Sequence, residues 1–269
     1  MTARTARIAG LSAALTISVA LTGCGILDNQ ASGKDTKVSV ATPRDALLQA
    51  VPDEKAGAYK FDIKQNGVTI NGVLDPVKKA YDVKVVTVQA GKGFKLTVND
   101  STKVLKEGTW VKISFSPANL QGLPKMPKKW MKVDLSKVKN AKDSLLQYDE
   151  NAADPGSTQL VVANAVDVQD AGAGKYTGTT DLTKTTDSGI AEEETLTALG
   201  DKAKAVPFTA TVAGGHLVSL VVDVPAAGKT KAYKYTVAYA GFGATATPTA
   251  PAAGEQTAAT PAAYEYLNS

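Results

Sequence analysis

The amino-acid sequence predicts an α+β fold dominated by an antiparallel β-sheet. Between residues 58 and 115, apolar and polar side chains alternate in successive short segments, which is typical of strands with one face on a core. Turn signals such as Asn66-Gly67 and Gly91-Lys92-Gly93 separate these segments, so neighbouring strands should pair as an antiparallel meander. Helical signals appear only before and after the meander, so few helices are expected.

The first helix is expected directly before the meander. Thr42 suits the N-cap position, Pro43 suits the first helical position, and Asp45 lies near the positive end of the helix dipole. Pro52 should end the helix, because proline cannot continue the hydrogen-bond ladder. The apolar side of this helix comprises Ala46, Leu47, Ala50 and Val51.

The meander is expected to contain at least four strands, each with one apolar face. Asn99-Asp100 indicates a further turn within it. The alternating apolar positions are Tyr59, Phe61, Ile63, Val68, Ile70, Tyr81, Val83, Val85, Phe94, Leu96, Val98, Val111, Ile113 and Phe115.

The second half begins with a crossover. Residues 116–129 contain three prolines and one glycine, which excludes a central strand there. Asp154-Pro155 predicts a helix start, and residues 175–182 read as a strand. A further helix should begin at Asp187-Ser188 and run through Leu199, with Gly200 as its C-terminal cap.

Three closing strands follow, and then a polar tail. Apolar side chains alternate over residues 206–212, 218–224 and 233–239, with Gly214-Gly215 as a turn between the first two segments. Beyond residue 243 the chain consists largely of Ala, Thr, Pro and Gly, so residues 248–269 are expected to be disordered. Tyr264 and Tyr266 are the exceptions in that tail.

The N-terminus has the layout of a secretory signal. Arg4 and Arg7 precede residues 8–22, a run of 15 residues without a charged side chain. A membrane-spanning helix needs roughly 20 apolar residues, so a removable signal is favoured over a permanent span. The run ends in Leu21-Thr22-Gly23-Cys24, which resembles the lipobox of bacterial lipoproteins and contains the only cysteine of the chain.

The lipobox resemblance implies that Cys24 carries diacylglycerol on its sulfur and, after cleavage, becomes the first residue of the mature chain, further acylated for example with palmitate. Residues 1–23 would be a lipoprotein signal peptide and residues 24–41 a flexible tether, because they are polar and rich in small side chains. The protein is then expected on the extracytoplasmic face of the cell membrane, held by its lipid anchor. The alternative is an ordinary secretory signal that ends near a cysteine.

Composition argues against several classes of function. Without residues 1–23, which carry Arg4 and Arg7, 28 basic and 26 acidic side chains remain, a net charge of +2. No basic stripe indicates nucleic-acid binding. His216 is the only histidine and lies at an expected hairpin, so neither a catalytic triad nor a His/Cys metal cluster is expected. No enzymatic activity and no cofactor are predicted.

The element order and several short motifs are similar to the actinobacterial lipoprotein family named after LppX, LprA, LprF and LprG. The motifs are residues 176–182 (YTGTTDL), 206–210 (VPFTA) and 235–243 (YTVAYAGFG), and the resemblance spans residues 42–247. It implies a curved antiparallel sheet, a half-barrel like that of LolA-type carriers, wrapped on helices around an apolar cavity. It also implies a role in moving lipids or glycolipids across the envelope, with an envelope transporter as a further partner.

The half-barrel would place a set of apolar strand positions on the concave face. For each of them, packing against helices is the alternative to ligand contact. Two functions therefore remain: a lipid-anchored carrier or chaperone that binds the acyl chains of envelope lipids, and a ligand-free interaction module tethered to the membrane. The candidate cavity residues are Phe94, Leu96, Val98, Val111, Ile113, Phe115, Phe208, Leu220 and Val222.

Overall fold

The structure is a computed structural model that describes residues 41–269 apart from 92, 142–144 and 150–151. The expected signal peptide, Cys24 and the tether as far as residue 40 lie outside the described residues. The described helices are α1 (Pro43–Ala50), α2 (Thr158–Ala163), α3 (Glu193–Leu199) and α4 (Pro261–Leu267), with 3₁₀ turns η1 (Leu135–Lys137), η3 (Leu182–Lys184), η4 (Thr186–Ser188), η5 (Gly200–Ala205) and η6 (Ala253–Glu255).

Within the described residues, twelve strands form one open sheet in the order β12-β6-β5-β4-β3-β2-β1-β11-β10-β9-β8-β7. All neighbours pair antiparallel except β12 and β6, which are parallel. The strands are β1 (Tyr59–Gln65), β2 (Val68–Asp75), β3 (Ala80–Gly91), β4 (Phe94–Leu105), β5 (Gly108–Ser116), β6 (Trp130–Val133), β7 (Ala165–Gly172), β8 (Lys175–Thr180), β9 (Val206–Ala213), β10 (His216–Val224), β11 (Tyr233–Ala240) and β12 (Gln256–Ala258).

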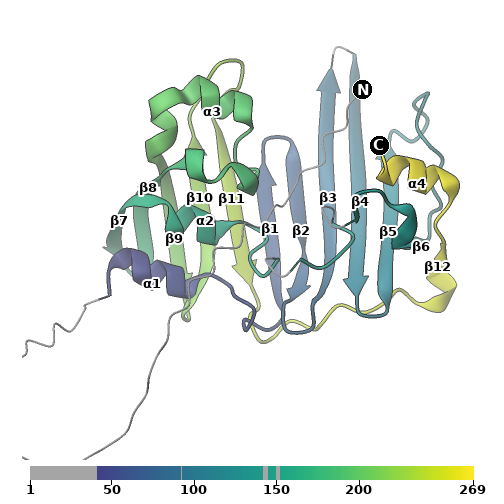
Figure 1. Cartoon of the computed structure of the whole chain (residues 1–269), viewed down its shortest axis with the longest axis horizontal. Coiled ribbons are helices and arrows are strands. Elements are labelled where there is room, and N and C mark those ends of the chain that lie inside the picture. Colours follow the sequence, from purple (N-terminus) through teal and green to yellow (C-terminus); the bar gives the residue numbers. More distant parts are fainter. Residues whose placement is uncertain (1–40, 92, 142–144, 150–151) are drawn as a thin grey trace, which may run out of the picture.

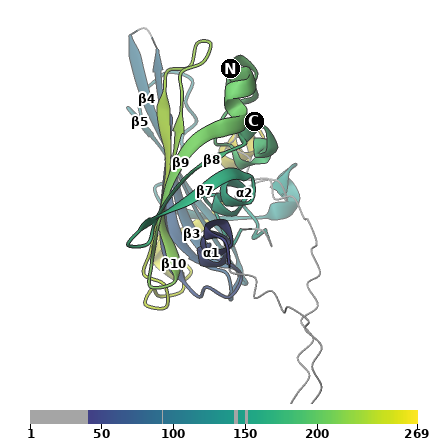
Figure 2. The ribbon, with the colours of Figure 1, turned by 90° about the vertical axis from the view of Figure 1, so that its left-hand side faces the viewer.

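The sheet is curved, and its helices lie on one face (Figures 1 and 2). We call the face that bears the helices the inner face and the opposite one the outer face. The α+β class and the curved, mostly antiparallel sheet agree with the prediction from the sequence. The strand order also explains the topology: β1 pairs with β11, so the first meander and the closing strands join in the middle of the sheet.

Local signals in the sequence account for many element boundaries. Thr42 and Asp45 form a reciprocal capping box, and Pro43 is the first residue of α1. Gly67 adopts a φ of 77° in the two-residue turn that joins β1 and β2, which glycine adopts without strain. Gly200 ends α3, as its position after the apolar residues predicts.

Other boundaries differ from the prediction. Asn99-Asp100 makes no turn, because β4 continues through it and reverses only after Leu105, at residues 106–107. The helix expected from Asp154 begins at Thr158, and the following residues form β7 instead of continuing the helix. The helix expected from Asp187-Ser188 is divided into η4 and α3.

The expected disorder of residues 248–269 is wrong. Gln256–Ala258 form β12 beside β6, and Pro261–Leu267 form α4 with Thr260 as its side-chain cap. The small Ala263 is fully buried in a cluster with Val111, Ile113 and Met131, among others. The tail is ordered because it packs on apolar side chains from other parts of the chain. The composition of the tail alone does not reveal this contact.

The inner face carries two main hydrophobic clusters. The first joins α1, α2, α3, η3 and η5 to strands β1–β4, β7 and β9–β11, with Leu47, Val161 and Leu220 fully buried. The second lies under α4 and the segment that follows β6, and it includes Val111, Ile113 and Met131. A small third cluster forms around Trp110, together with Ala80 and Leu105.

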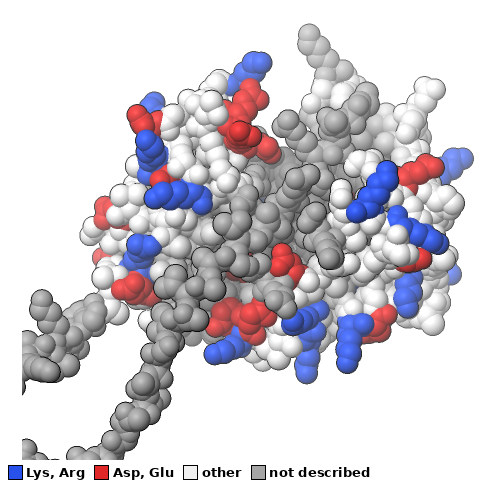
Figure 3. Space-filling model, viewed as in Figure 1, with Lys and Arg blue, Asp and Glu red and all other residues white. Residues whose placement is uncertain are grey.

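Charged side chains lie mainly around the rim of the inner face (Figure 3). Acidic side chains gather beside α3, where Glu192, Glu193 and Glu194 follow one another in the sequence. The interior of the inner face has a largely apolar lining, which makes its few polar groups informative about function.

Candidate functional site

The register of the sheet aligns apolar side chains in rows across the inner face. In these rows, residues of neighbouring strands stand directly opposite one another. One row contains a single charged member, Asp100, and a second row contains a single polar member, Thr87. The first row is Ile113, Asp100, Val85, Ile70, Ile63, Val237, Leu220 and Ala210, and the second is Phe115, Val98, Thr87 and Val68.

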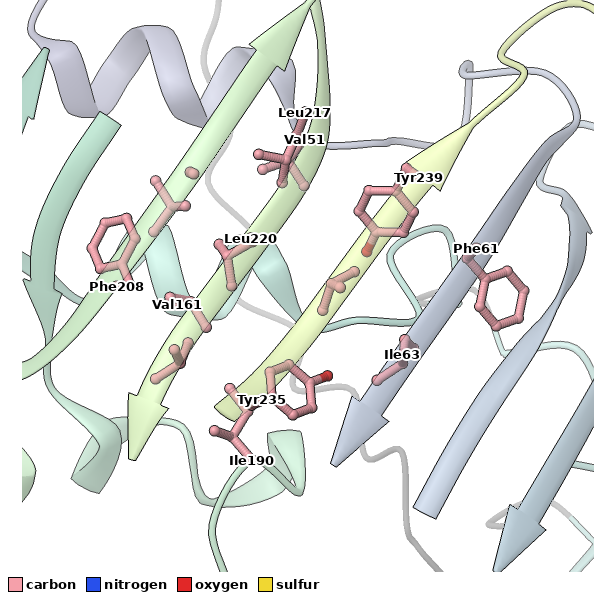
Figure 4. Packing of buried hydrophobic residues seen from close by; sticks show 14 of the residues in the cluster. Val51, Phe61, Ile63, Val161, Ile190, Phe208, Leu217, Leu220, Tyr235 and Tyr239 are labelled. Carbon is pink, nitrogen blue, oxygen red and sulfur yellow. The ribbon is translucent and has the colours of Figure 1, made fainter. Parts of the chain in front are cut away.

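The two clusters divide the predicted cavity residues. Phe208, Leu220 and Val222 are buried in the first cluster beneath the helices (Figure 4). Val111 and Ile113 are buried in the second cluster, and Phe115 packs against it. These six side chains share the inner face but belong to two separate clusters, and core packing is their main role in the structure.

The remaining three candidates lie along the upper half of β4. Val98 is buried without belonging to either main cluster, Leu96 is half-buried, and Phe94 is 51% exposed at the strand end. Phe94 therefore belongs to the tip of the β3–β4 hairpin, outside the interior. Cys24, the predicted lipidation site, lies outside the described residues.

We define the central strip as the inner-face side chains between the two clusters on β2 to β5. Most of them are only half-buried, which distinguishes them from the fully packed side chains on either side. The central strip consists of Val68, Val85, Thr87, Leu96, Val98, Asp100 and Phe115.

Asp100 is the charged group of the central strip. Its Oδ2 accepts a hydrogen bond of 2.9 Å from the Tyr266 hydroxyl of α4, whereas Oδ1 is buried with no partner among the described residues. Burial raises the pKa of Asp100, and the Tyr266 hydrogen bond opposes that rise only in part. The unpaired Oδ1 of Asp100 is therefore available as a hydrogen-bond acceptor for a ligand hydroxyl.

α4 contributes Tyr264 and Tyr266 to this region, the two tyrosines of the tail for which the sequence alone gives no role. The Tyr266 ring packs edge-on against Phe115 with ring centroids 5.9 Å apart. The Tyr264 hydroxyl accepts a hydrogen bond of 2.9 Å from the backbone N–H of Asp134. The tail therefore closes one end of the central strip. The sequence analysis did not predict this contact of the tail. Two aromatic side chains in an otherwise polar tail were the one indication that the tail packs on the fold.

A second buried carboxyl group, Asp154, serves the fold. Its Oδ1 accepts from the hydroxyls of Tyr239 and Thr158, and its Oδ2 accepts from the backbone N–H of Gln159 at 2.7 Å. Burial raises the pKa of Asp154, and these hydrogen bonds oppose the rise. Both oxygens are satisfied, so Asp154 fixes the start of α2 onto β11 instead of facing a ligand.

Two further recesses lie away from the central strip. One, of about 560 Å³, opens between β6, β12 and α4, where Lys137 pairs with Asp134 and lies 5.6 Å from the centroid of the Tyr264 ring. The other lies along α3 beside Glu192, Glu193 and Glu194. Both are open to solvent, and in the first the remaining charged side chain, Lys132, lies over the Trp110 ring at 5.3 Å from its centroid.

The described residues give no sign of a metal centre or a membrane-spanning helix. Nowhere in residues 41–269, apart from the gaps given above, do three His, Cys, Asp or Glu side chains gather as metal ligands. No helix in the same residues is long and apolar enough to cross a bilayer. His216 stacks on Phe242 with ring centroids 4.2 Å apart, which occupies one face of its imidazole.

Comparison with known proteins adds no family assignment. No protein-family model matches the chain, and no curated protein matches it. The resemblance to the LppX and LprG family therefore stays a prediction from the sequence motifs.

Proposed function

We propose that the protein is a lipid-anchored lipoprotein of the cell envelope that binds acyl chains of envelope lipids or glycolipids on its inner face. The observation that carries the proposal is the central strip, where half-buried apolar side chains lie between two packed clusters. The lipobox-like residues ending at Cys24 support the anchor and the extracytoplasmic location. The protein would act as a carrier or chaperone, not as an enzyme.

An acyl chain along the central strip would bind by burial of apolar area. Each methylene removed from water contributes about 0.8 kcal/mol, so roughly ten methylenes give a gross gain of about 8 kcal/mol before the costs of ordering. Thr87 and Asp100 are the polar side chains of the strip. Asp100, whose Oδ1 has no partner among the described residues, would offer a hydrogen-bond acceptor to a lipid hydroxyl near the chain.

The test is the lipid content of the protein purified from an actinobacterial host. Native mass spectrometry followed by solvent extraction should detect a stoichiometric acyl lipid. Replacing Val98 by Trp fills the central strip and should abolish lipid retention, and Leu96→Trp provides a second, less crowded variant. Thr97→Trp is the matched control, because Thr97 is next to both residues on β4 and points to the outer face.

Two outcomes of this experiment would count against the proposal. A protein that is free of lipid and takes up none from vesicles would exclude acyl-chain binding. Equal lipid retention in Val98→Trp, Leu96→Trp and Thr97→Trp, all folded by circular dichroism, would exclude the central strip as the binding site.

A second candidate function is a ligand-free interaction module tethered to the membrane. The observation in its favour is the dense packing of six predicted cavity residues, among them Leu220 and Val222, which are fully buried without a ligand. In that case the loops at the rim would contact partner proteins or wall components, and no lipid would copurify.

A further inference from the structure

The β3–β4 hairpin ends in an exposed apolar tip. Among the large hydrophobic side chains of the described residues, Phe94 is 51% exposed and Val88 is 39% exposed. Two others are exposed elsewhere, Val77 in the turn between β2 and β3, and Val166 on the edge strand β7. Only the hairpin tip therefore brings two such side chains to one end of the sheet.

The tip has apolar side chains on both faces of the sheet, with Gln89 beside them on the inner face and Lys95 on the outer face. Phe94 and Leu96 belong to the inner face, whereas Val86 and Val88 point to the outer face, because side chains alternate along each strand. The hairpin also projects: Phe94, Lys95 and Leu96 extend beyond the pairing of β4 with β5, which ends at Thr97 and Ser116. A projecting element with apolar side chains on both faces is suited to enter an apolar medium.

The loop of residues 117–129 starts beside this tip, since it follows Ser116. Its apolar side chains Leu120, Leu123 and Met126 are half-buried. Its lysines, Lys125, Lys128 and Lys129, are exposed, as is Lys95 on the hairpin. Exposed lysines beside apolar side chains are typical of surfaces that lie at a lipid headgroup layer.

The hairpin tip and the loop carry lysines and no acidic side chain of their own. The sequence has no acidic residue between positions 83 and 99, nor between 108 and 133. The acids that flank these stretches in the chain are Asp82, Asp100, Glu107 and Asp134; Asp82 pairs with Lys103, Asp134 pairs with Lys137, and Asp100 bonds to Tyr266. The acidic side chains beside α3 lie to the left of the hairpin, at the same upper edge of the molecule (Figures 1 and 3).

We propose that the tip of the β3–β4 hairpin and the loop of residues 117–129 together form a docking surface for a membrane with anionic lipids. Phe94 and Val88 would enter the headgroup layer while Lys95, Lys125, Lys128 and Lys129 contact lipid phosphates. This surface borders the central strip at Leu96, and the proposal rests on the proposed carrier function, which it extends by naming where the carrier meets a bilayer.

The chain between Cys24 and the fold is long enough for this orientation. Residues 24–41 number 18, so their contour length is at most about 60 Å. β4 has 12 residues and is roughly 40 Å long, and α1 lies near the end of the sheet opposite the hairpin tip (Figure 1). An anchored protein can therefore turn the docking surface towards the membrane that holds its anchor.

The experiment uses a chain that begins at Gly25, so that no lipid anchor contributes to binding. All members of the three hydrophobic clusters lie at or after Leu47, so this chain retains the complete packed core. It also contains no cysteine. An environment-sensitive dye on Ala90→Cys at the tip should respond to phosphatidylglycerol vesicles, and the same dye on Lys106→Cys at the opposite end should not.

Flotation with vesicles then measures the contribution of each group. Phe94→Ser should lower the partition coefficient on phosphatidylglycerol about tenfold, whereas Val77→Ser, an equally exposed apolar residue at the opposite end, should leave it unchanged. Neutralising Lys125, Lys128 and Lys129 to Gln should lower it roughly a hundredfold. The control with the same loss of charge replaces the lysines Lys78, Lys79 and Lys106 by Gln at the opposite end.

Several results would overturn the docking surface. The first is equal binding to phosphatidylcholine and phosphatidylglycerol vesicles. The second is an equal loss of vesicle binding in a docking-surface variant and in its control at the opposite end. The third is a response of the dye at position 106 to the vesicles. Retention on polyglutamate without any vesicle binding would assign the lysines to an acidic protein partner instead. Solvent extraction of the lysine variant tests the proposed function separately, because acyl lipid should remain bound when docking is lost.

Discussion

The buried contact between Tyr239 and Asp154 predicts a stability change that depends on pH. Tyr239→Phe removes a hydroxyl that donates to the Asp154 carboxylate and accepts from the backbone N–H of Gly156 at 3.2 Å. A hydrogen bond to a charged group contributes about 1.5–3 kcal/mol, and the second, neutral bond contributes about 1 kcal/mol. The free energy of unfolding should therefore fall by about 3 kcal/mol at pH 7.

The sign of the pH dependence follows from the raised pKa of Asp154. A carboxyl group whose pKa is higher in the folded state contributes most to stability at low pH, and that contribution is lost as pH rises through the folded pKa. The Tyr239 hydroxyl lowers this pKa, so Tyr239→Phe raises it further. The destabilisation caused by Tyr239→Phe should therefore be larger at pH 7 than at pH 4.

Urea unfolding followed by tryptophan fluorescence measures the destabilisation at pH 7 and at pH 4, since Trp110 is buried and reports the loss of the fold. Tyr235→Phe is the matched control: its hydroxyl donates to the neutral backbone oxygen of Gly156 at 3.0 Å, so it should cost about 1 kcal/mol at either pH. A destabilisation by Tyr239→Phe that is the same at pH 4 and pH 7 would refute the role given to the Asp154 charge.

Three further predictions concern the tail, the central strip and the sheet. Removing residues 256–269 should uncover the cluster around Met131, lower the urea midpoint and increase the binding of a hydrophobic dye; an unchanged midpoint would contradict the packing of α4. Asp100→Asn should stabilise the protein at pH 7 and lose that gain below about pH 3, where the acid is mostly neutral in both the folded and the unfolded state; a gain that is equal at both pH values would contradict the raised pKa. Gly72→Ala should cost about 1–3 kcal/mol, because its Cβ would lie 2.2 Å from the Asp82 backbone oxygen, whereas Gly254→Ala meets no atom within 4 Å and should be neutral in the same urea assay.

The sequence predicted the elements whose signals are local. Strict alternation around Phe61 and Ile63, and the turn at Asn66-Gly67, depend on residues a few positions apart, and the structure has the corresponding strands and turn. Asp100 was placed in a turn because aspartate usually favours turns, yet its strand partners Val85 and Ile113 hold it in β4. Such pairing is decided by tertiary contacts, which a single sequence does not display.

The candidate site was predictable only in outline. The inner face and its apolar character follow from alternation, but the division of that face between two clusters depends on which segments cover it. Tyr266 reaches Asp100 across 166 positions of sequence, and Tyr239 reaches Asp154 across 85. Neither pair carries a local signal, so both appear only once the fold is known.

The pairing of β1 with β11 has a consequence for the order of events during synthesis. Lys60 stands opposite Ala240, so the strand at the centre of the sheet lacks one neighbour until nearly the whole chain has been made. Pairing at this separation carries a loop-closure cost that slows folding. A nascent chain therefore cannot complete the centre of the sheet before β11 has been made. The topology thus delays the finished fold until the last strands have arrived.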